Sequence, residues 1–236
     1  MQLTVRDIAN LFKVPQKTVY RWIKEQGLPS SQVHGQYRFN RAEVLDWATI
    51  RKFQVPSGFL MQPDENGAAL PSLLGALEAG GVFHGIEGAD KPSVFRAIVA
   101  VMPLPKDVDR ELLWRMLLAR EALQSTGVGD SIAIPHVRNP IVLHVARPSA
   151  TLCFLARPLD FDALDGKPVQ VLFTLVSTTV RTHLHLLARL AFALRQPAFK
   201  NTVLRQANAQ EIFKAIEKIE NQLPASRAAA DKGTGI

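Results

Sequence analysis

His136 stands among residue types that together can hold a phosphoryl group. Arg120 lies upstream of it, and the pair Ser125-Thr126 opens the glycine-containing run STGVG between them. An imidazole is nucleophilic near neutral pH. The phosphoryl group that it would receive needs hydrogen-bond donors around it, which a guanidinium, hydroxyls and backbone amides supply. We therefore interpret His136 as a candidate phosphoryl acceptor.

The elements predicted around His136 would hold it in a fixed position. Residues 125–129 predict a turn-rich loop, whose glycines let the backbone approach an anion closely. Residues 132–134 are typical of a short buried strand, which Pro135 ends. We expect His136 at the end of this strand, beside the loop.

The residue types alone leave a second interpretation open, because a histidine at a strand end is often a structural or surface residue. A helix predicted over residues 182–194 carries two more histidines, His183 and His185. They are two positions apart and point to widely separated faces, so both cannot line one site. We interpret His185 as a helix-surface residue. The Cys/His spacing of the chain does not fit a zinc site, and we expect no metal.

The stretch from 120 to 138 resembles the active-site signature of enzyme IIA domains of the fructose/mannitol type in the bacterial phosphotransferase system, including the nitrogen-regulatory branch. The resemblance rests on Arg120-Glu121, the STGVG loop and the run IAIPH that ends at His136. It extends over residues 70–222. Ser131 departs from the pattern, since family members often have glycine there, and a serine is small enough to be tolerated.

The resemblance implies an α/β domain with a mixed sheet flanked by helices, and a phosphoryl group that arrives from a phosphohistidine of HPr or an HPr-like carrier. It implies catalytic roles for His136, Arg120 and His183, with His183 donating to the phosphate or orienting the His136 ring. It implies no cofactor, and catalysis here means carrying a phosphoryl group. A surface role fits Arg138 equally well. The candidates for holding the phosphoryl oxygens are Ser125, Thr126, Gly127, Gly129 and Arg138.

Residues 1–53 predict a small DNA-binding module. The pattern predicts a helix that begins after Thr4, a second over residues 17–26 and a third over 41–52, with a hairpin over 31–39. Two short helices joined by a tight turn form a helix-turn-helix. The segment resembles the excisionase-like or MerR-like winged helix-turn-helix family in the runs DIA, TVYRWI, GLP and YRF and in a following tryptophan.

Charge supports a DNA-binding role for this module, with a fold reused for protein contact as the alternative. The module carries a net charge of +5 out of +7 for the whole chain, whose pI is near 9.8. The exposed face of the second helix would enter a major groove, and the hairpin would reach phosphate or the minor groove. A single module is a weak reader, so we expect a homodimer on two half-sites. The candidate DNA contacts are Gln16, Lys17, Thr18, Tyr20, Arg21, Lys24 and Arg38.

The length of 236 residues suits two modest domains. Residues 54–69 read as a linker rich in proline, glycine and polar residues, residues 70–223 alternate helices and strands as in a layered α/β domain, and residues 224–236 are expected to be disordered. The single cysteine, Cys153, excludes an internal disulfide and fits a reducing compartment. No signal-peptide core or apolar run of ~20 residues is evident, so we expect a cytoplasmic protein without membrane insertion.

Three functions of different classes follow. The preferred one is a transcription regulator, in which the IIA-like domain reports phosphotransferase flux and the helix-turn-helix reads DNA or meets a regulatory target protein. The second is a plain phosphocarrier that passes phosphate to a separate sugar permease subunit. The third is a DNA-binding or scaffold protein that no longer transfers phosphate. The basic module favours the first over the second, and the intact Arg120, His136 and His183 argue against the third.

Overall fold

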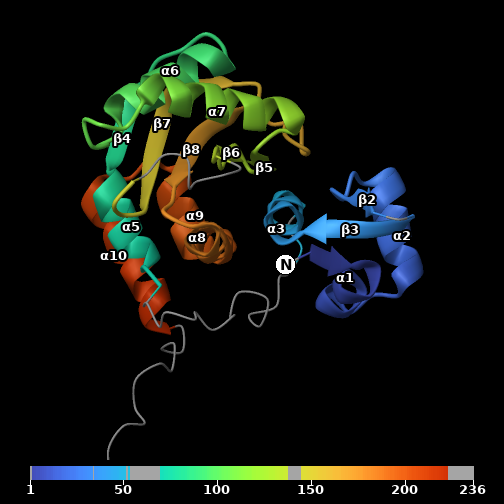
Figure 1. Ribbon diagram of the computed structural model, residues 1–236. Coiled ribbons are helices and arrows are strands. Elements are labelled where there is room, and N and C mark those ends of the chain that lie inside the picture. Colours follow the sequence, from blue (N-terminus) through green and yellow to red (C-terminus); the bar gives the residue numbers. More distant parts are fainter. Residues whose placement is uncertain (1, 34, 52, 54–69, 138–144, 223–236) are drawn as a thin grey trace, which may run out of the picture.

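The computed structural model describes residues 2–33, 35–51, 53, 70–137 and 145–222. The predicted linker over 54–69, the predicted tail over 224–236 and Arg138 lie outside the described residues. Figure 1 shows a small amino-terminal unit beside a larger unit that contains the rest of the described chain.

The small unit has three helices and a three-stranded antiparallel sheet with the strand order β1-β3-β2. The predicted helices and hairpin are confirmed, and a short first strand adds to them. Thr4 caps the first helix as predicted, because its side chain accepts from the Asp7 N–H and the Asp7 carboxylate accepts from the Thr4 N–H. The elements are β1 (Gln2–Thr4), α1 (Val5–Phe12), α2 (Gln16–Glu25), β2 (Ser31–Val33), β3 (Gln36–Asn40) and α3 (Arg41–Ile50).

The large unit contains a five-stranded mixed sheet with the order β4-β7-β8-β6-β5, which confirms the predicted α/β class. The β4–β7 and β6–β8 pairs are parallel, and the β7–β8 and β5–β6 pairs are antiparallel. In the described part of the chain, no helix combines the length and apolar character needed to cross a bilayer. The elements are α5 (Leu73–Gly80), β4 (Val82–Ile86), α6 (Lys91–Val101), α7 (Arg110–Leu123), β5 (Gly127–Gly129), β6 (Ile132–Ala133), β7 (Ser149–Leu159), β8 (Val169–Val176), α8 (Val180–Leu194), α9 (Pro197–Leu204) and α10 (Ala209–Gln222).

Helices cover both faces of the large sheet. α6 and α7 cover one face, and α5, α8, α9 and α10 cover the other (Figure 1). The central strands β7 and β8 are therefore buried on both sides, which accounts for their continuous apolar runs. Cys153 in β7 is fully buried on the α6–α7 side, and this burial raises the pKa of its thiol to about 12. Cys153 thus serves as a small apolar residue of the core.

Residues 127–129 form a strand, where the sequence predicted a turn-rich loop. They make β5, which pairs with β6 through a tight hairpin turn. The turn residues Asp130 and Ser131 have φ values of 54° and 61°, and a type I′ hairpin turn requires positive φ at both central positions. Ser131 therefore occupies a left-handed conformation that glycine adopts more readily, at the position where the enzyme IIA pattern often has glycine.

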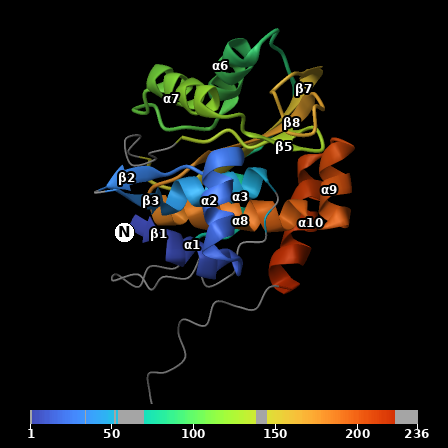
Figure 2. The same cartoon turned by 90° about the vertical axis from the view of Figure 1, so that its right-hand side faces the viewer.

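α3 packs against both units and is therefore buried on two sides. Val44, Trp47 and Ala48 lie in the core of the small unit. Leu45 is 1% exposed and belongs instead to the apolar cluster on the α8 face of the large sheet. α3 contacts both α8 and β5, and Figure 2 shows the small unit lying against α8. This second buried side was not predicted from the sequence.

Candidate functional site

His136 lies three residues after the end of β6 and continues the pairing with β8 through an isolated bridge to Leu175, so it lies near the strand end where the sequence placed it. The main chain is fixed there to β8, because the Leu175 N–H donates to the Pro135 carbonyl at 3.1 Å. Side chains alternate along an extended chain, so His136 projects from the same face as Ile132 and Ile134. Those two residues belong to the apolar cluster on the α8 face of the sheet. His136 therefore points toward α8.

One hydrogen bond sets the protonation of the His136 ring. Nδ1 lies 2.8 Å from the carbonyl oxygen of Ile134. A carbonyl oxygen only accepts, so Nδ1 carries the proton and Nε2 presents a lone pair. Arg120 Nε donates to that Nε2 at 3.3 Å, which requires the same tautomer. The ring is thus a neutral imidazole whose nucleophilic nitrogen faces a fixed positive charge.

Arg120 comes from the last turn of α7 and is 7% exposed. Its Nη1 donates to the Gln124 carbonyl at 2.9 Å. This bond to the end of its own helix fixes the guanidinium beside His136, so the charge does not depend on a mobile surface side chain.

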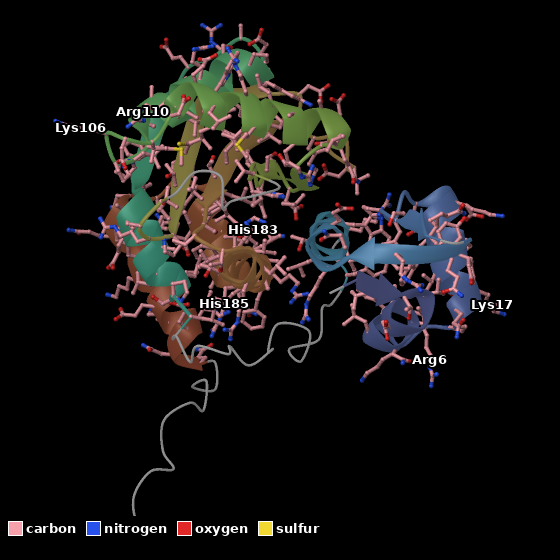
Figure 3. All side chains as sticks on the ribbon, viewed as in Figure 1. Arg6, Lys17, Lys106, Arg110, His183 and His185 are labelled. Atoms are coloured by element: carbon pink, nitrogen blue, oxygen red, sulfur yellow. The ribbon has the colours of Figure 1, made fainter. Side chains whose placement is uncertain are left out.

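α8 brings His183 next to His136. The ring centroids are 5.0 Å apart, and the exposed fractions are only 3% for His136 and 2% for His183. His185 lies elsewhere, since its Nε2 is 3.1 Å from the Pro71 carbonyl, and Figure 3 shows the two labelled side chains on different sides of α8. The prediction that His185 is a helix-surface residue is therefore corrected. His185 is half-buried, and desolvation together with the charge of Arg189 lowers its pKa.

The hydroxyl groups of Ser125 and Thr126 are engaged within the protein. Ser125 Oγ donates to the Phe161 carbonyl, and Thr126 Oγ1 donates to the Glu121 carboxylate at 2.6 Å. Each hydroxyl has a single proton to donate. In this structure the two residues therefore build β5 and its entry, and their predicted contact with phosphoryl oxygens stays a prediction.

Close packing at Gly127 and a positive φ at Gly129 explain why β5 has glycine at these two positions. A Cβ atom on Gly127 would lie 2.8 Å from the Cβ of Ala163, closer than side chains tolerate. Gly129 has a φ of 82°, which favours glycine. From the sequence, both glycines were predicted to let the backbone approach an anion. The structure adds a folding reason for each, and their role toward an anion also stays a prediction.

Glu121 is a residue of the site that the sequence analysis did not assign. It is 6% exposed, and its Oε2 accepts from the Thr126 N–H at 2.9 Å as well as from the hydroxyl. Its Oε1 pairs with Lys91 of α6 at 3.1 Å. Glu121 therefore ties the end of α7 to the start of β5. Its position next to Arg120 in the signature was the available signal.

Lys91 completes this network between two carboxylates. It pairs with Glu121 and, at 2.8 Å, with Asp162. Desolvation pulls the pKa of Lys91 down, but the hydrogen bonds and charges of the two carboxylates outweigh it, and the pKa lies above its ordinary value. Lys91 therefore remains charged at neutral pH and balances the buried Glu121.

The predicted DNA contacts lie mainly on the outer face of α2. Arg38 on β3 is half-buried and donates to the Gln36 side chain at 2.8 Å and to the Tyr37 carbonyl at 3.2 Å. Thr18 is half-buried as well. In Figure 3, Lys17 lies on the side of the small unit away from the large unit. The exposed members of the predicted set are Gln16, Lys17, Tyr20, Arg21 and Lys24.

Comparison with known proteins finds a matching family for each of the two units. The family described as "Phosphoenolpyruvate-dependent sugar phosphotransferase system, EIIA 2" matches residues 76–219, and a helix-turn-helix domain family matches residues 3–50. The chain is similar to the nitrogen regulatory protein of Pseudomonas aeruginosa, with 33% identity over 140 residues that cover 58% of this chain and 88% of that protein. It is also similar to the fructose-specific EIIABC component of Bacillus subtilis, with 29% identity over 136 residues that cover 56% of this chain and 21% of that protein.

A solved structure resembles the large unit. The nitrogen regulatory protein IIA-Ntr from Neisseria meningitidis superposes with a TM-score of 0.51 and 26% identity, over 65% of this chain and 99% of that chain. The similarity therefore spans that protein almost completely and about two thirds of this chain.

Replacing Glu121 with alanine should lower the free energy of unfolding by about 3 kcal/mol, because the buried Thr126 N–H and hydroxyl lose their acceptor and Lys91 loses a partner. Urea denaturation followed by circular dichroism measures this change. Glu217→Ala on the exposed face of α10 is the matched control, with a change within about 0.5 kcal/mol. Equal effects of the two substitutions would contradict the structural role of Glu121.

Proposed function

Since this chain belongs to the EIIA 2 family of the phosphoenolpyruvate-dependent sugar phosphotransferase system, we propose that it accepts a phosphoryl group on Nε2 of His136. The observation that carries the proposal is the pair of bonds on one ring. The Ile134 carbonyl holds the proton on Nδ1, and Arg120 stands at Nε2. The ring is therefore prepared as a nucleophile at one defined nitrogen.

The transfer forms one bond and breaks one. The Nε2 lone pair attacks the phosphorus of a phosphohistidine on an HPr-like carrier, in line with the bond to the carrier's imidazole. That bond breaks, its electron pair returns to the carrier's ring, and the carrier becomes a neutral histidine once it takes up a proton from water. Arg120 passes from Nε2 to a phosphoryl oxygen, where its charge stabilises the transferring group. The Nδ1–H bond to Ile134 persists throughout.

His183 is the second side chain that we assign to this reaction. Its ring lies 5.0 Å from that of His136, within reach of a phosphoryl group on Nε2. It is also in the first turn of α8, where the helix dipole favours a nearby negative charge. We assign His183 to hydrogen bonding with the phosphoryl oxygens. The amides of β5 and Arg138 are further candidates for the same task.

We propose that the small unit binds DNA through α2, so that the chain acts as a regulator. The support is the match to a helix-turn-helix family, the net charge of +5 on residues 1–53, and the exposed basic face of α2. A phosphoryl acceptor joined to such a unit is suited to reporting phosphotransferase activity to a promoter.

Intact mass after incubation with phosphoenolpyruvate, enzyme I and HPr tests the acceptor. The chain should gain one phosphate-sized increment that is labile in acid, and His136→Ala should gain none. His183→Ala should keep the final increment but lower its rate roughly 100-fold, because a donor to the transferring group is lost. His84→Ala, an exposed histidine of β4, is the matched control and should behave as the unaltered chain does.

Phosphorylation of the His136→Ala variant to the same extent would contradict the assignment of the acceptor. A chain that gains no phosphate from any carrier would leave the enzyme IIA fold without transfer activity.

Fluorescence anisotropy with a labelled generic duplex tests the DNA-binding face. Arg21→Ala and Lys17→Ala should each weaken binding and reduce the slope of log affinity against log salt concentration by about 1, because each removes one phosphate contact. Lys214→Ala on α10 is exposed and equally basic, and it should leave the slope unchanged. Equal slopes for all the variants would contradict binding through α2.

A further inference from the structure

We propose that α3 is an intramolecular cover of the His136 site, so that the small unit must move away before a phosphocarrier protein can reach Nε2. The proposal rests on the proposed function only in naming the phosphocarrier as the partner that is kept out. The cover itself is a property of the structure that can be measured without any phosphoryl transfer.

The first observation is the second buried side of α3. A three-helix unit of this size needs one apolar side on its third helix, and Val44, Trp47 and Ala48 supply it. Leu45 is 1% exposed within the cluster that α8 and the large sheet form. Thr49 lies one turn further along the side that carries Leu45 and is also buried, with an exposed fraction of 9%. Leu45 thus packs with the apolar cluster of the large unit and not with the core that Val44, Trp47 and Ala48 share in the small unit.

The second observation is where α3 lies on the large unit. It contacts β5 and α8. β5 is the edge strand beside β6, which leads into His136, and α8 carries His183. Since His136 projects toward α8, the corner between α8 and the β5 edge is the side from which a protein would approach Nε2. α3 occupies that corner (Figures 1 and 2).

The third observation is the burial of both histidines, at 3% and 2% exposure. Transfer from a phosphohistidine needs the reacting atoms to come within about 3–3.5 Å in line. A folded carrier cannot bring its own ring to that distance from a side chain that solvent barely reaches. The docked arrangement is therefore closed to transfer.

The cover leaves the proposed DNA face open. α2 lies on the side of the small unit away from the large unit, and Lys17 points outward there (Figure 3). A phosphoryl group on His136 would add negative charge beneath the apolar side of α3. A closed arrangement tolerates that charge poorly, so phosphorylation should favour the undocked form, and by linkage undocking should favour phosphorylation.

Carbethoxylation by diethyl pyrocarbonate, read by peptide mass spectrometry, tests the cover. The reagent modifies accessible neutral imidazoles, and the exposed His84 provides the internal reference. In the unaltered chain His136 should react at least about tenfold more slowly than His84. Leu45→Asp places a charge in the apolar contact and should raise the His136 rate roughly tenfold or more, with the His84 rate unchanged.

Asn10→Asp is the matched control, because it adds the same charge at an exposed position of α1. It should leave the His136 rate unchanged. Fluorescence of Trp22 and Trp47 reports whether the small unit stays folded, and Leu45→Ala replaces Leu45→Asp if it does not. The proposed cover would be overturned if neither Leu45 variant raised the rate of His136 carbethoxylation. It would also be overturned if Asn10→Asp raised that rate equally.

Transfer from phosphorylated HPr then separates this inference from the proposed function. Faster transfer to Leu45→Asp than to the unaltered chain supports the cover as a barrier to the carrier. Equal transfer rates for Leu45→Asp and the unaltered chain would contradict the proposal that α3 keeps the carrier out. If carbethoxylation rises but neither chain accepts phosphate, the cover is supported and the proposed acceptor function is refuted.

Discussion

The hydrogen bond from Nδ1 of His136 to the Ile134 carbonyl is the constraint on which the site depends. Donor and acceptor are two residues apart in the same extended segment, so the main chain itself selects the tautomer. With Nδ1 protonated, the Nε2 lone pair is directed at Arg120. A main-chain carbonyl does not titrate, so this orientation of the ring needs no neighbouring carboxylate.

The surrounding structure keeps three elements in register around that ring. The bond from Leu175 N–H to the Pro135 carbonyl fixes the end of β6 to β8. Glu121 and its partner Lys91 connect α6, the end of α7 and the start of β5. α8 supplies the second histidine from the face opposite α7. The site thus lies where helices from both faces of the sheet meet at its edge, and α3 packs on this same corner.

Local signals predicted most elements and the place of His136, because the apolar run, Pro135 and the helix periodicity are each contained in a short stretch. They did not predict what long-range contacts decide. Lys91 is far from Glu121 in sequence, and no spacing pattern connects them. Leu45 was predicted to be buried, but its contact with the large unit was not evident, because Val44 and Trp47 already give α3 an apolar side toward the small unit. His185 was predicted to lie on the helix surface because no local pattern indicates its contact with the Pro71 carbonyl, which belongs to a distant part of the sequence.

The protonation state of His136 tests the central claim most directly. A long-range proton–nitrogen correlation spectrum of the chain with ¹⁵N-labelled histidine distinguishes the two ring nitrogens, and His136→Gln assigns the signal. We predict a neutral ring with the proton on Nδ1, and phosphorus coupling at Nε2 after transfer. A ring protonated at Nε2, or phosphorus coupling at Nδ1, would contradict the account.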